Sequence, residues 1–358
     1  MDKPRIIAFY LPQFYPTPEN DEWWEPGFTE WTNVARAKPL FRGHYQPRIP
    51  QELSFYDLRV PAVRERQAEL AREAGIEGFC YWHYWFSGKR LLDRVFTEVI
   101  ETGKPDFPFC LCWANHSWYQ KTWDPNKPDK LLIEQEYPGD QDYINHFNAL
   151  LPAFKDHRYM KYKGKLIFGI FNSDEIDTFY KMKSIWDKLA KENNLPGFYF
   201  FGFCQGEHRL HKTISRGYDD VVYDHMATVY KSLKPTIFSK LMRRIFHRPI
   251  TLNYSRYVRD SIKFFKEHPS LVPCMIPNFD HSPRSAERGI IMVDSTPDRW
   301  YQYCRDMRNH VDKLHSQEQL IFIKAWNEWG EGNYMEPDMR FGRGYINATK
   351  KAFGESDN

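Results

Sequence analysis

The chain has 358 residues, of which 42% are hydrophobic and 27% charged, with a formal net charge of +3. No apolar run approaches the ~20 residues that cross a bilayer, and the charge is too small to indicate nucleic-acid binding, which usually needs a concentrated basic face. Six cysteines are too few for a disulfide scaffold, and the first residues show no secretory signal. We therefore expect a soluble cytoplasmic protein, although a secreted or periplasmic protein trimmed of its signal would have the same composition.

Eight short segments rich in β-branched and aromatic residues predict β-strands. In chain order they cover residues 5–11, 75–82, 108–115, 165–172, 198–204, 220–225, 271–278 and 320–328. Amphipathic segments with helical spacing lie between them, at 61–75, 91–103, 142–154, 178–193 and 298–314. This alternation predicts a (β/α)8 TIM barrel with long βα loops, and an open doubly wound sheet is the competing arrangement.

No linker or break in composition divides the chain, so we predict that residues 1–358 form a single domain. The stretch 12–57 is too long for a plain βα connection, and its many aromatic rings favour a functional loop over disorder. Aromatic residues make up 17% of the chain, which is more than core packing usually demands. Some of these rings are therefore expected to face a ligand, because amphipathic rings can stack on sugars.

A basic insertion is predicted at about residues 226–258, where no Asp or Glu occurs. Apolar residues between Ile237 and Phe246 form one helical stripe, with Lys240, Arg243 and Arg244 opposite. Such a helix could contact an anionic membrane or an acidic glycan. A lid helix packed on the barrel is the alternative, and the sequence favours it.

Polar and aromatic residues gather at the carboxyl ends of the predicted strands, where barrel enzymes carry their chemistry. We predict that a sugar-binding wall is formed by Tyr10, Trp82, His83, Tyr84, Trp113, Asn115, His116, Tyr223, Asn278 and Asn327. A metal held by histidines is the alternative, with His83, His116, His225 and His281 as ligands beside Asp280. Their spacing matches no metal signature, and hydrogen bonding to sugar hydroxyls explains the same residues. We therefore expect a carbohydrate substrate, and neither a metal nor another cofactor.

The last predicted strand leads into two glutamates. Strand alternation would turn Ile321, Ile323 and Ala325 toward the helices, and would leave the barrel interior to Phe322, Lys324, Trp326 and Glu328. Gly330 and Gly332 permit a tight turn that brings Glu331 back to the same cavity.

Two close carboxyl groups in a partly dry pocket should not both ionise freely, so one pKa should rise and give an acid beside a base. Cleavage of a glycosidic bond requires this combination. The alternative is a purely structural role, in which Glu328 and Glu331 only accept hydrogen bonds from backbone amides. Glu336, which lies beyond the second glycine, is a weaker candidate and is predicted to bind substrate.

These residues belong to longer motifs, which are residues 8–16, 27–47, 78–92 and 112–118 together with Asn327-Glu328-Trp329-Gly330-Glu331. Through them most of the chain closely resembles the WbsX-like family, which belongs with glycoside hydrolase family 99 and its endo-α-mannosidases. The resemblance implies a (β/α)8 barrel, no metal, and a retaining hydrolase. In that mechanism Glu328 would assist the 2-hydroxyl of the substrate, and Glu331 would act as general acid and then base. Gly330 stands where endo-α-mannosidases have a bulkier polar residue, which leaves α-mannoside specificity open.

Members of this family often accompany genes for surface polysaccharide assembly and carry the label glycosyltransferase. The resemblance therefore implies, as the alternative, a glycosyltransferase of lipopolysaccharide, O-antigen or capsule biosynthesis. Such an enzyme commonly needs an Asp-x-Asp metal site or a Gly-rich turn, and the sequence offers only Asp140-Gln141-Asp142. That pair precedes a predicted helix, where Asp is favoured as cap and dipole partner. A catalytically silent sugar-binding barrel is the third class, and the glutamate pair counts against it.

Overall fold

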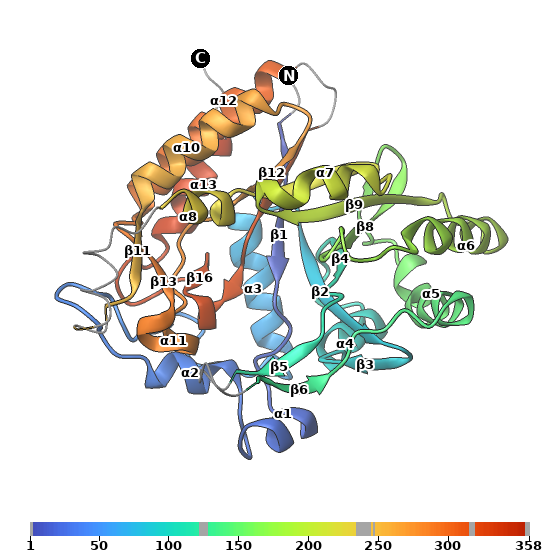
Figure 1. The fold of residues 1–358 in the computed structure, drawn as a ribbon, viewed down its shortest axis with the longest axis horizontal. Coiled ribbons are helices and arrows are strands. Elements are labelled where there is room, and N and C mark those ends of the chain that lie inside the picture. Colours follow the sequence, from blue (N-terminus) through green and yellow to red (C-terminus); the bar gives the residue numbers. More distant parts are fainter. Residues whose placement is uncertain (1–2, 122–127, 234–244, 246–247, 315–318, 355–358) are drawn as a thin grey trace.

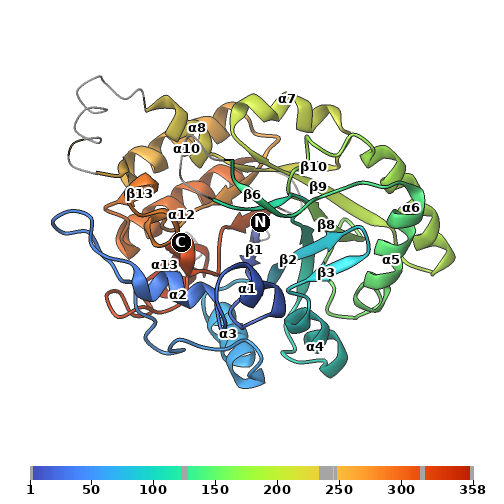
Figure 2. The ribbon, with the colours of Figure 1, turned by 60° about the horizontal axis from the view of Figure 1, so that its bottom comes forward.

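The computed structural model describes residues 3–121, 128–233, 245, 248–314 and 319–354. Its main sheet contains eight parallel strands, which are β1 (Arg5–Tyr10), β2 (Gly78–Phe86), β4 (Phe109–Trp113), β8 (Lys165–Ile170), β9 (Phe198–Gln205), β10 (Asp220–Asp224), β12 (Val272–Met275) and β14 (Leu320–Ile323). Because β1 pairs with both β2 and β14, the sheet closes on itself (Figures 1 and 2). The predicted TIM barrel is thus confirmed, and the open sheet is wrong.

Helices surround the barrel and occupy the predicted segments. The five expected helices are observed as α3 (Pro61–Glu73), α4 (Arg94–Thr102), α5 (Asp140–Phe154), α6 (Phe179–Glu192) and α12 (Pro297–Val311). The other described helices are α1 (Pro18–Trp23), α2 (Glu30–Arg36), α7 (Glu207–Ser215), α8 (Met226–Ser232), α10 (Tyr254–Glu267), the single-turn α11 (Ser282–Ser285) and α13 (Gly344–Gly354). Both α3 and α12 begin with proline, whose fixed φ suits the first helical position.

Eight further short strands are described outside the barrel strands, in the connections between elements. They are β3 (Lys89–Leu91), β5 (Trp118–Gln120), β6 (Lys130–Ile133), β7 (Lys161–Tyr162), β11 (Ile250–Asn253), β13 (Ile290–Val293), β15 (Asn327–Glu328) and β16 (Asn333–Tyr334). The long connection after β1 carries α1 and α2. At the other end of the chain, β15 and β16 form a small antiparallel pair around the 3-10 turn Trp329–Glu331.

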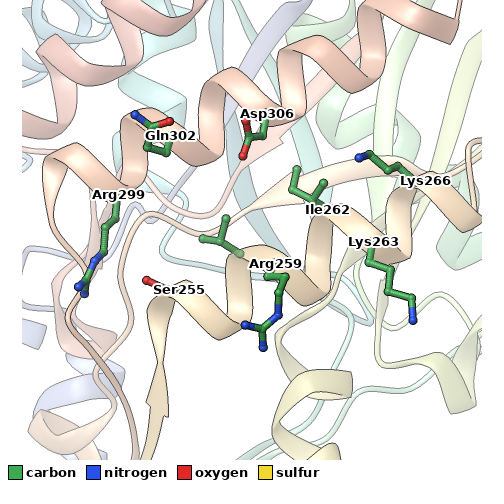
Figure 3. A pocket seen from close by; sticks show the side chains of 9 residues that line it. Ser255, Arg259, Ile262, Lys263, Lys266, Arg299, Gln302 and Asp306 are labelled. Carbon is green, nitrogen blue, oxygen red and sulfur yellow. The ribbon is translucent and has the colours of Figure 1, made fainter.

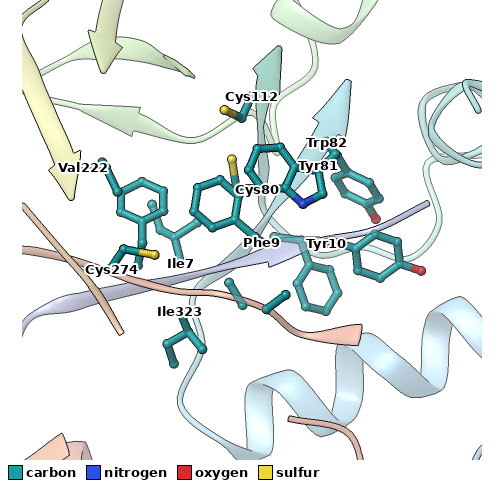
Figure 4. Packing of buried hydrophobic residues seen from close by; sticks show 14 of the residues in the cluster. Ile7, Phe9, Tyr10, Cys80, Tyr81, Trp82, Cys112, Val222, Cys274 and Ile323 are labelled. Carbon is teal, nitrogen blue, oxygen red and sulfur yellow. The ribbon is translucent and has the colours of Figure 1, made fainter. Parts of the chain in front are cut away.

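Aromatic rings fill the barrel interior (Figure 4). Phe9 stacks on Trp82 with ring centroids 4.4 Å apart, and Phe322 lies 5.4 Å from Phe9. Phe322 therefore faces the interior, as predicted. Trp326 does not, because its ring lies 5.5 Å from Phe79, in the layer between the strands and the helices. The alternation fails at Trp326 because regular strand β14 ends three residues earlier, at Ile323.

The basic insertion is only partly described. Its described portion comprises residues 226–233 with α8, residue 245, and residues 248–258 with β11 and the start of α10. Most of the predicted amphipathic stripe, together with Lys240, Arg243 and Arg244, lies outside the described residues. Among the helices that the structure describes, none has the length and apolar character needed to span a membrane.

Candidate active site

Two cavities are candidates for a functional site. One of about 550 Å³ lies on the outer helical layer between α10 and α12, among surface side chains such as Arg259 and Lys263 (Figure 3). The other, of about 680 Å³, is lined by residues from the carboxyl ends of the barrel strands and the loops after them. The second cavity lies where the chemistry of TIM barrels is found, and it contains Glu328 and Glu331.

The two glutamates share one guanidinium group. Nη1 of Arg284 donates to Oε1 of Glu331 at 2.7 Å and lies 3.7 Å from Oε1 of Glu328. The two carboxylate oxygens cannot be farther apart than the sum of these distances. Oε2 of Glu328 is buried without a hydrogen-bond partner among the described residues, which is uncommon for a buried polar atom.

The two carboxyls differ in how readily they ionise. Burial and the negative charge of Glu331 raise the pKa of Glu328 to about 7. Burial also opposes the ionisation of Glu331, but the charges of Arg284 and Lys324 outweigh it and hold that pKa below its usual range. The difference follows from distance, since Arg284 is closer to Glu331. Glu328 is therefore the more readily protonated of the two, the reverse of the order that the family resemblance implies.

Arg284 is held in place by Glu30. Nε of Arg284 donates to Oε2 of Glu30 at 3.1 Å, and Gln13 donates to Oε1 of the same carboxylate at 2.8 Å. Glu30 is the first residue of α2, whose start is capped by the Thr29 hydroxyl. A Cβ atom at Gly330 would lie 1.8 Å from Oε2 of Glu30, so the missing side chain leaves the space that the Glu30–Arg284 pair occupies.

A second buried network fixes the turn that carries Glu331. Asp280, at the carboxyl end of the β12 region, accepts hydrogen bonds from His44 and Gln46 in the long loop after β1. Arg48 from the same loop donates to the carbonyl of Gly332 at 2.8 Å, and the Asp280 amide donates to the carbonyl of Glu331 at 2.6 Å. Gly332 has a φ of +51°, a left-handed conformation that favours glycine.

The structure brings five of the predicted site residues to this cavity. Trp82, Tyr84 and His116 line it together with Glu328 and Glu331. Burial and the negative charge of Glu328 raise the pKa of Tyr84 far above its usual value, so its hydroxyl stays protonated.

Four predicted wall residues point toward the helices instead. The Tyr10 hydroxyl donates to Gln67 in α3, and Nε2 of His83 lies 2.8 Å from Nε2 of His146 in α5. The ring of Trp113 lies against the same His146, and Tyr223 stacks on Phe264 of α10. The sequence prediction took every polar residue at a strand end and did not apply alternation, by which His83 must oppose Trp82 and Tyr84.

Three asparagines predicted to bind substrate instead connect neighbouring strand ends. The side chain of Asn327 bonds both backbone groups of Leu11, and that of Asn278 bonds both backbone groups of Tyr334. Asn115 bonds the backbone of Asn172 in the same two-sided way. All three side chains are buried away from the cavity lining, so their positions correct the predicted wall.

Glu336 is also turned away from the cavity. Its carboxylate accepts hydrogen bonds from Tyr56, Gln67 and Trp329, and burial raises its pKa to about 7. Glu336 thus has a structural role, because it binds the side chain of Trp329 in the turn Trp329–Glu331.

Several lining residues were absent from the predicted site. They are Gln13, Trp23, Trp24, Phe28, Glu30, Trp118, Gln205, His281, Arg284 and Lys324. Three sequence features could have indicated some of these residues. They are the aromatic-rich loop after β1, the motif at residues 27–47 that contains Glu30, and the strand alternation that placed Lys324 inside the barrel. Arg284 gave no such signal, because it lies in the loop after β12, beyond the predicted strand.

The proposed metal ligands do not converge. His83 contacts α5, and His225 packs against Phe264 at 4.4 Å. In the described part of the chain no group of three or more His, Cys, Asp or Glu side chains has the geometry to hold a metal ion. Asp140 and Asp142 open α5, as expected for helix-terminal residues, and Asp142 accepts from the indole of Trp85.

Comparison with known proteins agrees with this architecture. The family described as Glycosyltransferase WbsX matches residues 6–349. The chain belongs to the WbsX family. Two sequences of the protein WxcX, from two strains of Xanthomonas campestris pv. campestris, are 34% and 33% identical to it over 350 residues, which is 97% of this chain and 49% of each relative. This WbsX-family chain thus spans about half the length of those relatives.

Solved structures share the fold of the WbsX-family chain at low sequence identity. A glycoside hydrolase-like protein superposes with a TM-score of 0.64 at 14% identity, covering 99% of this chain and 95% of that one. The GH99 endo-alpha-mannosidase from Bacteroides thetaiotaomicron gives a TM-score of 0.56 at 14% identity, covering 98% and 96%. These likenesses confirm the barrel fold.

Proposed function

We propose that this WbsX-family chain breaks glycosidic bonds as a retaining glycoside hydrolase, with Glu328 and Glu331 as the working pair. The supporting observation is that both carboxyls line one cavity at the carboxyl end of the barrel, where Arg284 pairs closely with only one of them. A proton donor beside a proton acceptor is the arrangement that glycosidic cleavage needs.

The proposed first step uses the 2-hydroxyl of the substrate. One carboxylate removes the hydroxyl proton as O2 attacks C1, while the other carboxyl donates its proton to the departing glycosidic oxygen. Water then opens the resulting 1,2-anhydro sugar with the proton transfers reversed.

Before O2 attacks C1, the carboxyl that acts as general acid must carry the proton, although the pKa values favour the proton on Glu328. We assign the base role to Glu328 and the acid role to Glu331, as the resemblance implies. A hydroxyl donated to the unpartnered Oε2 of Glu328 would favour its ionised form, and the proton would then pass to Glu331.

Transfer from a nucleotide sugar is the second candidate, which the family description favours. A nucleotide sugar brings a diphosphate that needs cations. Among the described residues, each Lys or Arg that lines the cavity lies within 4 Å of a carboxylate: Lys121 near Asp129, Arg284 near Glu30, Glu328 and Glu331, and Lys324 near Asp224. This charge balance supports hydrolysis over transfer.

Product analysis tests the proposal. The wild type, Glu328→Gln and Glu331→Gln would be incubated with defined glycans, with and without nucleotide sugars, and the products separated by mass. We expect cleavage without a nucleotide sugar, and a loss of about 10²–10⁴-fold in rate in either variant, the range for general acid–base groups. Glu65→Gln, which changes an exposed glutamate of α3, should retain the wild-type rate. Activity that depends on a nucleotide sugar would overturn the hydrolase assignment.

A further inference from the structure

Large aromatic side chains from two loops line the same cavity as the glutamate pair. We call Trp23, Trp24, Trp118 and Tyr119 the aromatic rim. Trp24 and Tyr119 are 45% and 47% exposed, although both are large rings that burial would normally stabilise. Trp23 and Trp118 are less exposed, and their rings meet edge to face with centroids 5.8 Å apart.

The rim is built by two elements far apart in the sequence. Trp23 ends α1 in the loop after β1, and Trp118 begins β5, which pairs with β6 after barrel strand β4. The side-chain amide of Gln120 donates to the carbonyl of Trp23 at 3.3 Å, which joins the two elements. Trp24 is further supported by Phe28, with the rings stacked at 5.5 Å. The exposed ring of Trp24 is thus held in place by a contact within the protein.

The chemistry around the rim suits a sugar chain. A pyranose ring presents apolar C–H faces, which stack on aromatic rings, and hydroxyl edges, which need hydrogen-bond partners. Asn33 and Ser117 line the same cavity beside the rings and offer such partners. An anionic lipid surface would instead need free cations, and the nearby Lys121 is paired with Asp129.

We infer that the aromatic rim is a sugar-binding subsite for units of a glycan chain that lie beyond the bond at Glu328 and Glu331. The ligand is therefore an oligosaccharide or polysaccharide that extends from the pair to the rim. This inference rests on the proposed function for the position of the reacting bond, but glycan binding at the rim can be measured without turnover.

The test uses the slow variant Glu331→Gln. This protein, and the same protein carrying Trp24→Ala or Tyr119→Ala, would be applied to an array of bacterial oligosaccharides of increasing length. Titration calorimetry would follow with the best-bound length series. We expect each rim substitution to weaken binding of the longest members by about tenfold and to leave disaccharide binding within about twofold. Tyr180→Ala, which removes a 65% exposed ring from α6, is the matched control and should change neither.

Each outcome decides the inference. Equal loss for all lengths, no loss in the rim variants, or no glycan bound at all would overturn it. If the wild type cleaves glycans but the rim variants bind all lengths normally, the rim subsite is wrong and the proposed function stands. If the wild type cleaves nothing while rim-dependent glycan binding is found, the proposed function fails and the rim subsite stands.

Discussion

At the scale of single residues, one guanidinium group sets the chemistry of the candidate pair. Arg284 gives Glu331 a close ion pair and Glu328 only a distant one, so two similar carboxyls have pKa values shifted in opposite directions. Arg284 keeps this position because Glu30 braces it in the space beside Gly330. A residue without a side chain thus shapes the candidate site through its neighbours.

Substitution of Gly330 by alanine should test this arrangement. The added Cβ would displace the Glu30 carboxylate, so we expect Gly330→Ala to lower kcat/KM by about tenfold or more, which corresponds to ~1.4 kcal/mol or more. In a Glu30→Ala background the same substitution should cost much less, because the clash is gone. Additive losses in this double-mutant cycle would show that Gly330 acts by another route.

Arg284 should also control the pH dependence. The folded-state pKa of Glu331 is lowered by nearby cations, so its carboxylate form persists as the pH falls and is lost only below its usual range. Without the guanidinium charge that pKa should rise. We expect Arg284→Gln to move the acidic limb of the kcat/KM profile to higher pH, while Arg284→Lys keeps it close to the wild type. An unmoved limb in Arg284→Gln would contradict the assigned role.

At the scale of elements, the loop after β1 completes the site. It supplies Glu30, Trp23 and Trp24 to the cavity, and through His44, Gln46 and Arg48 it fastens onto Asp280 and the Glu331 turn. Burial opposes the ionisation of Asp280, but the hydrogen bond from His44 and the charge of Arg48 lower its pKa to about 2. The loop is thus attached by a buried charged group, in addition to its apolar contacts.

Removal of that carboxylate should loosen the loop. Asp280→Ala leaves Arg48 and His44 buried without their partner, so we expect the free energy of unfolding to fall by about 3–5 kcal/mol in urea titrations. Asp280→Asn, which keeps the shape, should lose less. Glu25→Ala breaks an exposed pair with Arg36 and should change stability by only ~0–1 kcal/mol. Similar losses for Asp280→Ala and Glu25→Ala would refute the anchoring role.

At the scale of the whole molecule, closure of the barrel depends on its aromatic interior. Phe322 of the last strand packs between Phe9 of the first strand and Phe201 of β9, with centroid distances of 5.4 and 5.0 Å. It therefore connects both ends of the chain to the middle of the barrel. Because this ring joins strands from both ends and the middle of the sequence, we still predict that residues 1–358 form a single domain.

Truncation of this ring should destabilise the entire barrel. We expect Phe322→Ala to lower the free energy of unfolding by about 3–5 kcal/mol, because a fully buried ring leaves a cavity. Tryptophan fluorescence and circular dichroism should shift together, since a single domain unfolds as one unit. Separate transitions for the two probes would argue against the single domain.

The amino-acid sequence by itself determined the eight strands, the five main helices and the position of Glu328 and Glu331. These features depend on local patterns: apolar runs, helical spacing, and a glycine turn just after a strand. Local patterns also predicted Trp82 and Tyr84 at the end of their strand. Strand alternation would have placed His83 on the opposite face, away from the cavity.

Only the tertiary structure decided what surrounds the pair. Glu30 and Arg284 are 254 residues apart in the chain, and no local pattern indicates that they meet. Likewise, Asn115, Asn278 and Asn327 look like ligands at strand ends until their backbone partners are seen. Barrel closure sets which loops become neighbours, and the charges of those neighbours determine which glutamate ionises more readily.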